Sequence, residues 1–280
     1  MKIIKSIMFN LAILLSLISY PKVTLAKELP DTATYAYYNA LPNEQKQNYN
    51  AVLDKVKNYD TDYAVLPNPI TRSELEVLVY AIQFDHPELF WISSSYNFRT
   101  RKTDDMVVQM SFDYLFNKSD IPALKQNFDA VTEALLEDIN SKSFKDDIAK
   151  EKYVYDLVCS LSTYNKANKN STYQSAYSVL IGGESVCAGY SRAFQYLLNQ
   201  EKIPAFFIPA YDPNDLSKRH AIVSVYVNGH FRLCDITTED AFREDTGKTT
   251  YHLFNLTGKE YSELSDYVFE DIAARSVIIE

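Results

Sequence analysis

Glycine, cysteine, histidine and tryptophan are all scarce in this sequence. Its 280 residues include 6 Gly, 3 Cys, 4 His and 1 Trp. So little glycine excludes collagen-like and Gly-rich low-complexity chains. Three cysteines are too few, and odd in number, for a small exported scaffold built on disulfides. A cysteine left unpaired in an exported protein is either a reactive thiol or a buried one.

Motifs for metal and phosphate binding are missing as well. The sequence has no His-Glu-x-x-His, no Cys-x-x-Cys and no glycine-rich phosphate loop, and its histidines at 86, 220, 230 and 252 are too scattered for a zinc cluster. We therefore expect neither a metal nor an organic cofactor. A net charge of -9 makes nucleic acid and anionic membrane surfaces poor partners.

Apolar and aromatic residues, by contrast, are abundant. Hydrophobic residues make up 46% of the chain and aromatic residues 14%, with 22 Tyr and 15 Phe. A chain of this composition can bury a sizeable core, which excludes wholesale disorder.

The first 26 residues have the pattern of a secretory signal peptide. Lys2 and Lys5 precede a mostly apolar run at residues 7–20, and Thr24–Ala26 offers small residues for cleavage after Ala26. Cleavage would remove three lysines and no acid, taking the net charge from -9 to -12. An uncleaved anchor is the alternative, but the run is shorter than the ~20 residues of a membrane span. We expect a soluble, secreted product without stable membrane association.

Two regions follow, divided near residue 145. Residues 27–144 are predicted to be a helix-rich N-terminal region that carries no chemical motif and packs against the core or shapes its substrate site. A capping box at Thr71–Glu74 and Ser119 as a helix cap are its clearest local signals. The predicted elements are helices at 43–59, 71–86 and 119–135 and strands at 89–96 and 106–115.

Residues 145–280 are predicted to form the core that carries the chemistry. Asn228-Gly229 is a strong signal for a two-residue hairpin turn between β-branched and aromatic strands. The predicted elements are helices at 144–164 and 187–198, a short apolar segment at 177–181, and strands at 206–210, 220–227 and 230–236.

Cys187 is expected in the first turn of its helix, with Ser185 or a neighbour as the cap. The unpaired N–H groups and the positive end of the helix dipole favour the thiolate there and can supply part of an oxyanion hole. Gly182, Gly183 and Gly189 are expected to let a substrate backbone approach closely. Taken alone, Cys187 is better explained as an inert buried thiol on a helix face.

The predicted hairpin brings a histidine and an aspartate together. A turn at Asn228-Gly229 places Asp235 opposite Ile222, so His220 is diagonal to Asp235 on the same face, ~7–8 Å away between Cα atoms. A carboxylate that holds one imidazole nitrogen leaves the other to take a proton from a thiol. Cys187, His220 and Asp235 thus have the pattern of a Cys-His-Asp triad for covalent acyl transfer.

The other two cysteines are predicted to be core residues. Cys159 lies on an apolar helical face, and Cys234 lies on the hairpin face opposite the triad. We therefore expect no disulfide to Cys187. His230, also on the face opposite His220, is expected to be a solvated bystander.

This combination resembles the bacterial transglutaminase-like superfamily, a branch of the papain-like fold. Cys187, His220 and Asp235 match the family triad one by one. The matching stretches are 176–198, Ile203-Pro204, His220-Ala221, 235–240 and, more weakly, 254–257, while 85–91 (Asp-His-Pro-Glu-Leu-Phe-Trp) resembles a segment ahead of this core in exported bacterial members.

Two positions depart from the family pattern. Ile222-Val223 stands where the family often has an aromatic residue and Asn, and Thr238 stands where it usually has Trp. Both changes remove aromatic walls near the triad and put the shape of the substrate site in doubt. They favour the alternative function, a non-catalytic module that binds a protein or cell-wall ligand.

The resemblance implies an α+β fold, in which a papain-like or transglutaminase-like core packs a Cys-bearing helix on an antiparallel sheet. It implies a secreted bacterial cysteine enzyme, at the cell wall or beyond it, that attacks amide carbonyls of protein, peptide or cell-wall peptide substrates and forms a thioester. Resolution by an amine gives transamidation, and resolution by water gives deamidation or proteolysis. The sequence leaves these three open.

Overall fold

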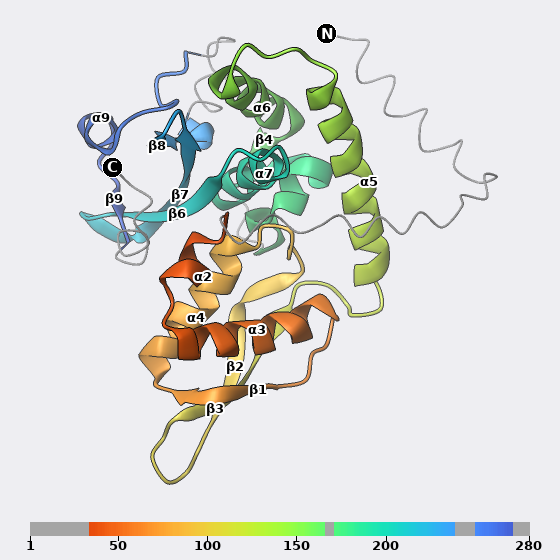
Figure 1. The fold of residues 1–280 in the computed structure, drawn as a ribbon, viewed down its shortest axis with the longest axis vertical. Coiled ribbons are helices and arrows are strands. Elements are labelled where there is room, and N and C mark those ends of the chain that lie inside the picture. The colour runs from red at the N-terminus through yellow and green to blue at the C-terminus, as the bar shows by residue number, and fades with distance from the viewer. Residues whose placement is uncertain (1–33, 166–170, 239–249, 271–280) are drawn as a thin grey trace, which may run out of the picture.

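The computed structural model describes residues 34–165, 171–238 and 250–270. The predicted signal peptide therefore lies outside the described residues. The fold is α+β, as the sequence predicts, with a three-stranded sheet in one half and a four-stranded sheet in the other (Figure 1). No helix in the described ranges is long and apolar enough to cross a membrane.

The first half combines helices with an antiparallel sheet of order β1-β3-β2. The capping box at the start of α4 is confirmed, since Thr71 N donates to Glu74 Oε2 at 2.8 Å and Glu74 N donates to Thr71 Oγ1 at 3.3 Å. The elements are α2 (Ala36–Ala40), α3 (Asn43–Lys57), β1 (Ala64–Ile70), α4 (Arg72–Asp85), β2 (Ile92–Thr100) and β3 (Val107–Tyr114).

Strand β1, which contains Pro67 and Pro69, is not among the predicted elements. Proline lacks a backbone donor and is tolerated in strands only at edges and bulges. β1 lies at the edge of its sheet, and its register with β3 shifts between Val65 and Ile70, around both prolines. The two prolines therefore occupy the irregular part of an edge strand.

Two long helices connect the halves. α5 (Ile121–Asn140) has Pro122 in its first turn, as predicted. The predicted cap is wrong, because the N-cap residue is Asp120, and the Ser119 hydroxyl instead donates to Asp120 Oδ1 at 3.0 Å. α6 (Asp147–Leu161) begins at Asp146, whose carboxylate accepts a hydrogen bond from Ala149 N at 2.8 Å.

In the second half, α7 packs on a four-stranded sheet of order β8-β7-β6-β9 (Figure 1). A short π-helix, η3, at Ser178–Gly182 precedes α7. The other elements are β4 (Thr163–Tyr164), η2 (Ser171–Gln174), β5 (Glu184–Ser185), α7 (Cys187–Gln200), β6 (Ala205–Asp212), β7 (Asp215–Val227), β8 (His230–Cys234), α9 (Gly258–Leu264) and β9 (Val268–Phe269).

The hairpin between β7 and β8 has the predicted register. Val227 pairs with His230 and Val223 with Cys234, and the turn residues Asn228 and Gly229 both have positive φ, 52° and 83°. Positive φ at both central positions is the signature of the type I′ turn that Asn-Gly favours.

Buried side chains of both halves belong to one continuous core. Tyr37 Oη donates to the carbonyl of Phe207 on β6 at 2.5 Å, and Gln195 Nε2 on α7 donates to the carbonyl of Phe84 on α4 at 2.8 Å. The rings of Phe84 and Phe207 stack with centroids 4.9 Å apart. These contacts fix α2 and α4 against the elements that carry the candidate site.

Candidate active site

Cys187 is the first residue of α7 and is partly exposed. The prediction that Ser185 caps this helix is wrong. The N-cap is Val186, to which the structure gives no side-chain cap, and Ser185 Oγ instead donates to the Tyr173 carbonyl at 2.8 Å. The first turn of α7 therefore keeps backbone N–H groups beside the thiol that no side-chain cap occupies, which suits an oxyanion.

Gly189, in the first turn of α7, is needed for packing within the chain. A Cβ there would lie 2.0 Å from Ser185 Oγ, 2.8 Å from the Tyr173 carbonyl oxygen and 2.9 Å from that of Ser175. The expectation that Gly189 admits a substrate backbone is therefore wrong. This glycine instead lets α7 lie directly against the segment that precedes it.

His220 and Asp235 meet across the hairpin. His220 Nε2 lies 2.7 Å from Asp235 Oδ2, and both side chains are almost fully buried. His220 lies on β7, and Asp235 follows the last residue of β8. Because Asp235 holds Nε2, the Nδ1 atom is the ring nitrogen that remains for exchange of a proton with a thiol.

Asp235 is held by several further donors. Thr238 donates to it through its backbone N at 3.2 Å and its Oγ1 at 3.1 Å, Thr237 Oγ1 donates at 3.2 Å, and Tyr261 Oη donates at 3.3 Å. Sequence reasoning missed Tyr261 because no motif within α9 itself marks it. These donors fix the carboxylate that in turn orients His220.

The electrostatics of the pair favour a charged imidazole. Burial lowers the pKa of His220, but the charge and hydrogen bond of Asp235, and then the Cys187 thiol, outweigh it and raise the pKa to about 10. Burial likewise opposes ionisation of Asp235, yet the charge of His220 and the bonds from Thr238 keep its pKa below the usual value. The pair is therefore an imidazolium and a carboxylate near neutral pH.

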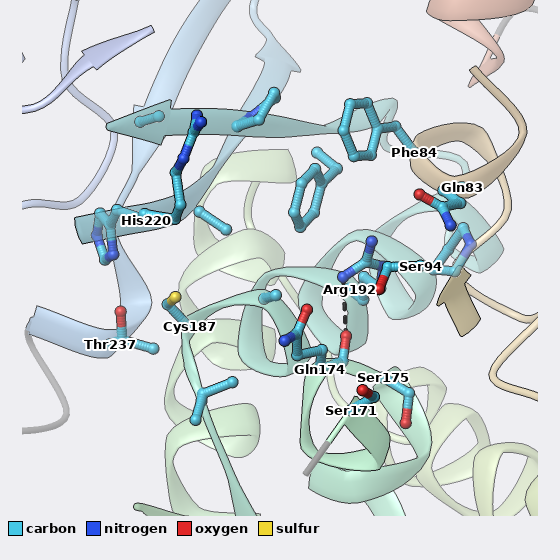
Figure 2. A pocket seen from close by; sticks show the side chains of 18 of the residues that line it. Gln83, Phe84, Ser94, Ser171, Gln174, Ser175, Cys187, Arg192, His220 and Thr237 are labelled. Carbon is cyan, nitrogen blue, oxygen red and sulfur yellow. Dashed lines mark hydrogen bonds between the residues drawn. The ribbon is translucent and has the colours of Figure 1, made fainter. Parts of the chain in front are cut away.

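Cys187 and His220 line the same pocket, which has a volume of about 970 Å³. Figure 2 shows the sulfur of Cys187 facing the strand that carries His220, with Thr237 beside both. Asp235 lies behind His220 and does not line this pocket. The structure thus brings the three predicted residues together with His220 in the middle.

Aromatic rings flank the site from positions that no motif marks. Tyr267 stacks on the His220 ring with centroids 4.4 Å apart and an interplanar angle of 26°, and Tyr164 on β4 lines the same pocket. Ile222 and Val223, the departures noted in the sequence, are fully buried within the sheet. The aromatic walls come from other elements, which single-sequence reasoning missed.

Cys159 and Cys234 are buried at 1% and 0% exposure, as predicted. Cys234 lies in a more polar setting than expected, because its Sγ donates to Glu151 Oε1 at 3.3 Å and burial raises the pKa of Glu151 to about 7. All three cysteines are among the described residues, and none forms a disulfide there. His230 is exposed at the hairpin end.

The pocket extends well beyond the triad. Gln83 and Phe84 on α4 and Ser94 on β2 line its far side, so the first half of the chain forms part of its wall (Figure 2). Arg192 on α7 lies between that wall and Cys187. Within the described residues, no group of three or more His, Cys, Asp or Glu side chains could hold a metal.

The family model for the Transglutaminase-like superfamily matches residues 133–236, which include all three candidate residues. No curated protein sequence matches the chain. Among solved structures, a "TGase" is 15% identical with a TM-score of 0.34, covering 62% of this chain and 50% of that one. A "putative cysteine protease" from Cytophaga hutchinsonii is 16% identical with a TM-score of 0.33, covering 51% of this chain and 61% of that one.

A "putative protease" from Parabacteroides distasonis is 14% identical with a TM-score of 0.32, covering 48% of this chain and 29% of that one. The chain therefore spans half of the first of these structures and less than two thirds of the other two.

Proposed function

The chain carries a core of the transglutaminase-like superfamily over residues 133–236, and on that basis we propose that it is a cysteine enzyme that transfers acyl groups from amide carbonyls. The single observation that carries this proposal is the His220–Asp235 pair, 2.7 Å apart, in one site with a thiol at the start of a helix. Nucleophile, base and orienting carboxylate in this order are what covalent acyl transfer requires.

The proposed reaction proceeds in two halves. His220 holds the thiol proton at Nδ1 while Cys187 sulfur attacks the carbonyl carbon, and the α7 N–H groups stabilise the oxyanion. As the C–N bond breaks, the imidazolium gives its proton to the leaving amine, and a thioester remains. His220 then takes a proton from water or a second amine, which attacks the thioester carbonyl. The C–S bond breaks, the acid or new amide leaves, and the imidazolium returns the proton to the Cys187 sulfur.

The acceptor decides the product, and transamidation, deamidation and proteolysis remain the candidates. We further propose that the substrates are proteins, peptides or cell-wall peptides outside a bacterial cell. The support for export is the signal-peptide pattern of residues 1–26.

A non-catalytic binding module is the second candidate function. The departures at Ile222-Val223 and Thr238 favour it, because they remove family aromatic residues. The stacking of Tyr267 on His220 argues for catalysis instead, since it supplies an aromatic neighbour to the imidazole from another element.

A screen of glutamine peptides with and without a primary amine tests the proposal. An active substrate should give a covalent adduct on Cys187, detected as an acyl-enzyme by intact mass spectrometry after rapid acid quench. Cys187→Ala and His220→Ala should abolish turnover, while Asp235→Asn should retain a residual rate after a loss of up to ~10⁴-fold, by analogy with serine triads.

Cys159→Ala is the matched control, because that thiol is buried on α6 and does not line the pocket. Turnover that survives Cys187→Ala at the wild-type level would exclude covalent catalysis by this residue. Ligand binding without any adduct would favour the binding module.

A further inference from the structure

Arg192 is the charged side chain of the pocket nearest in sequence to Cys187. It lies five residues after Cys187 on α7, and both line the same pocket. Figure 2 shows the guanidinium in the middle of the pocket, between Cys187 and the far side formed by Gln83 and Ser94. A substrate that reaches from the thiol toward the first half of the chain would pass this group.

The contacts of Arg192 leave most of its hydrogen-bonding capacity unused. Nη1 donates to the Gln174 carbonyl at 2.8 Å, and the guanidinium lies over the Phe207 ring, 4.4 Å from its centroid. A guanidinium has five N–H donors, and a carboxylate accepts two of them side by side. Across residues 34–165, 171–238 and 250–270, no carboxylate lies within ion-pair distance of Arg192.

The other cations of the pocket are already compensated. Arg219 pairs with Glu270, and Lys218 lies 3.4 Å from Asp212 and 3.5 Å from Asp215. Both are exposed at the pocket rim, whereas burial lowers the pKa of Arg192 to about 10. A partly buried cation without a paired carboxylate is costly, so Arg192 is the position in this pocket where an incoming carboxylate gains the most binding energy.

We propose that Arg192 is a specificity-determining residue that binds a carboxylate of the substrate. This inference rests on the proposed function of Cys187. Five helical residues span about 7.5 Å along α7, and an extended peptide advances ~3.3 Å per residue. The carboxylate therefore belongs about two residues from the attacked carbonyl.

Two sources can supply this carboxylate, an acidic side chain or the free C-terminus of a short peptide. If the carboxylate is an acidic side chain, the enzyme would prefer sites inside a longer protein or peptide. A C-terminal carboxylate would restrict the enzyme to peptide ends, as in cell-wall peptides.

Two other roles are open to Arg192. Its charge could stabilise the Cys187 thiolate, or its contacts with Gln174 and Phe207 could form a purely structural tie. An arginine that supports the thiolate would change the rate of every substrate alike, and so would a structural tie. Only a substrate contact changes the ratio between anionic and neutral substrates. The test therefore measures that ratio.

The experiment uses peptide chloromethyl ketones, in which the Cys187 thiolate displaces chloride to form a thioether. Pairs of reagents carry Glu or Gln at one, two or three residues from the ketone. A second pair carries the chloroketone in place of a glutamine side-chain amide, with a free or amidated C-terminus. We expect the wild-type protein to prefer one anionic reagent by about tenfold in inactivation rate.

Three variants identify the residue responsible. Arg192→Gln should reduce the anionic-to-neutral ratio to about one, and Arg192→Lys should retain part of it because a point charge lacks the fork of the guanidinium. Arg192→Glu should reverse the preference toward reagents with Lys at the same position. Lys218→Gln is the control and should keep the wild-type ratio.

The outcomes separate this inference from the proposed function. Alkylation of Cys187 at equal rates by anionic and neutral reagents overturns the anion subsite alone. A preference that persists in Arg192→Gln and Arg192→Glu also overturns it. Absence of Cys187 alkylation by every reagent, with iodoacetamide included, overturns the proposed function as well.

Discussion

At the scale of single residues, the candidate site depends on how Asp235 is held. It accepts hydrogen bonds from two threonines and Tyr261 and lies 2.7 Å from His220 Nε2. Its charge is what keeps a buried imidazole protonated, because burial on its own would favour the neutral ring. The role of Asp235 can therefore be measured through the pKa of His220.

In a Cys187→Ala background, Asp235→Asn should lower the pKa of His220 well below that of the Cys187→Ala parent, because Asp235 is the main group that raises it. The amide carries no charge to oppose the effect of burial. The C2-proton NMR signal of His220, titrated in a Cys187→Ala background, measures this shift. A pKa in the double variant equal to that of the Cys187→Ala parent would contradict the assignment of Asp235 as the main partner.

The same pair makes stability depend on pH in a defined window. The raised pKa of His220 contributes stability that is complete below 6.5 and is lost as pH rises through about 10. The lowered pKa of Asp235 contributes stability that is present above 3.8 and is lost as pH falls through its folded value. The difference in unfolding free energy between wild type and Asp235→Asn should therefore be largest between pH 4 and pH 6.5 and shrink on either side, as urea unfolding at several pH values can check.

Tyr261→Phe removes one donor from Asp235 without changing its charge. The hydroxyl lies 3.3 Å from Oδ2 and is fully buried, so its loss should cost about 0.5–1.5 kcal/mol of stability and a few-fold in turnover. Urea unfolding and steady-state kinetics measure the two effects. Tyr226→Phe, on an exposed strand position, is the control. Equal effects of the two changes would show that the Tyr261 hydroxyl does not support Asp235.

The residues of this site differ in how far the sequence predicts them. Cys187, His220 and Asp235 follow from a helix start and from the register of an Asn-Gly hairpin, both of which are local signals. Tyr267 and Tyr261 acquire their roles from segments that meet the triad only in three dimensions. Nothing in their own neighbourhoods in the sequence marks them.

At the scale of elements, the start of α7 is set by packing against the preceding segment. Tyr173, Ser175 and Ser185 lie so close to α7 that only glycine fits at 189. The sequence predicts the start of the helix correctly but assigns Ser185 the wrong role. A serine just before a helix has several possible acceptors, and here tertiary contacts with Tyr173 and Ser178 outweigh the local cap.

Gly189→Ala should move the start of α7 and with it Cys187. The added Cβ would meet two backbone carbonyls below 3.0 Å, and overpacking of this kind costs about 1–3 kcal/mol. We expect a lower urea midpoint and slower alkylation of Cys187. Gly182→Ala is the matched control, since its Cβ would meet nothing closer than 3.9 Å. Similar midpoints for the two variants would contradict the packing argument.

At the scale of the whole molecule, the first half supplies one wall of the pocket and shares its core. Tyr37 and Phe84 bind β6 and α7 through hydrogen bonds and ring stacking. The sequence predicts that this region packs on the core or shapes the substrate site. It does not predict strand β1, whose two prolines are unfavourable in most strand positions. Long-range contacts decide which face of α4 borders the pocket, and no local sequence pattern encodes them.

The shared core predicts that both halves unfold in one transition. Trp91 is the only tryptophan and is buried in the first half, so its fluorescence reports on that half alone. Far-UV circular dichroism reports on helices and strands of both halves. The two urea curves should coincide, and Tyr37→Phe should shift both by the same amount. Separate midpoints would show that the halves fold independently.

The central claim is that Cys187 is a nucleophile that His220 activates. Its most direct test is the rate at which iodoacetamide alkylates each cysteine near neutral pH, followed by peptide mass spectrometry in wild type and His220→Ala. We predict fast labelling of Cys187, much slower labelling of the buried Cys159 and Cys234, and a large drop at Cys187 alone in His220→Ala. Uniformly slow labelling of all three thiols, or a Cys187 rate that does not depend on His220, would contradict the account.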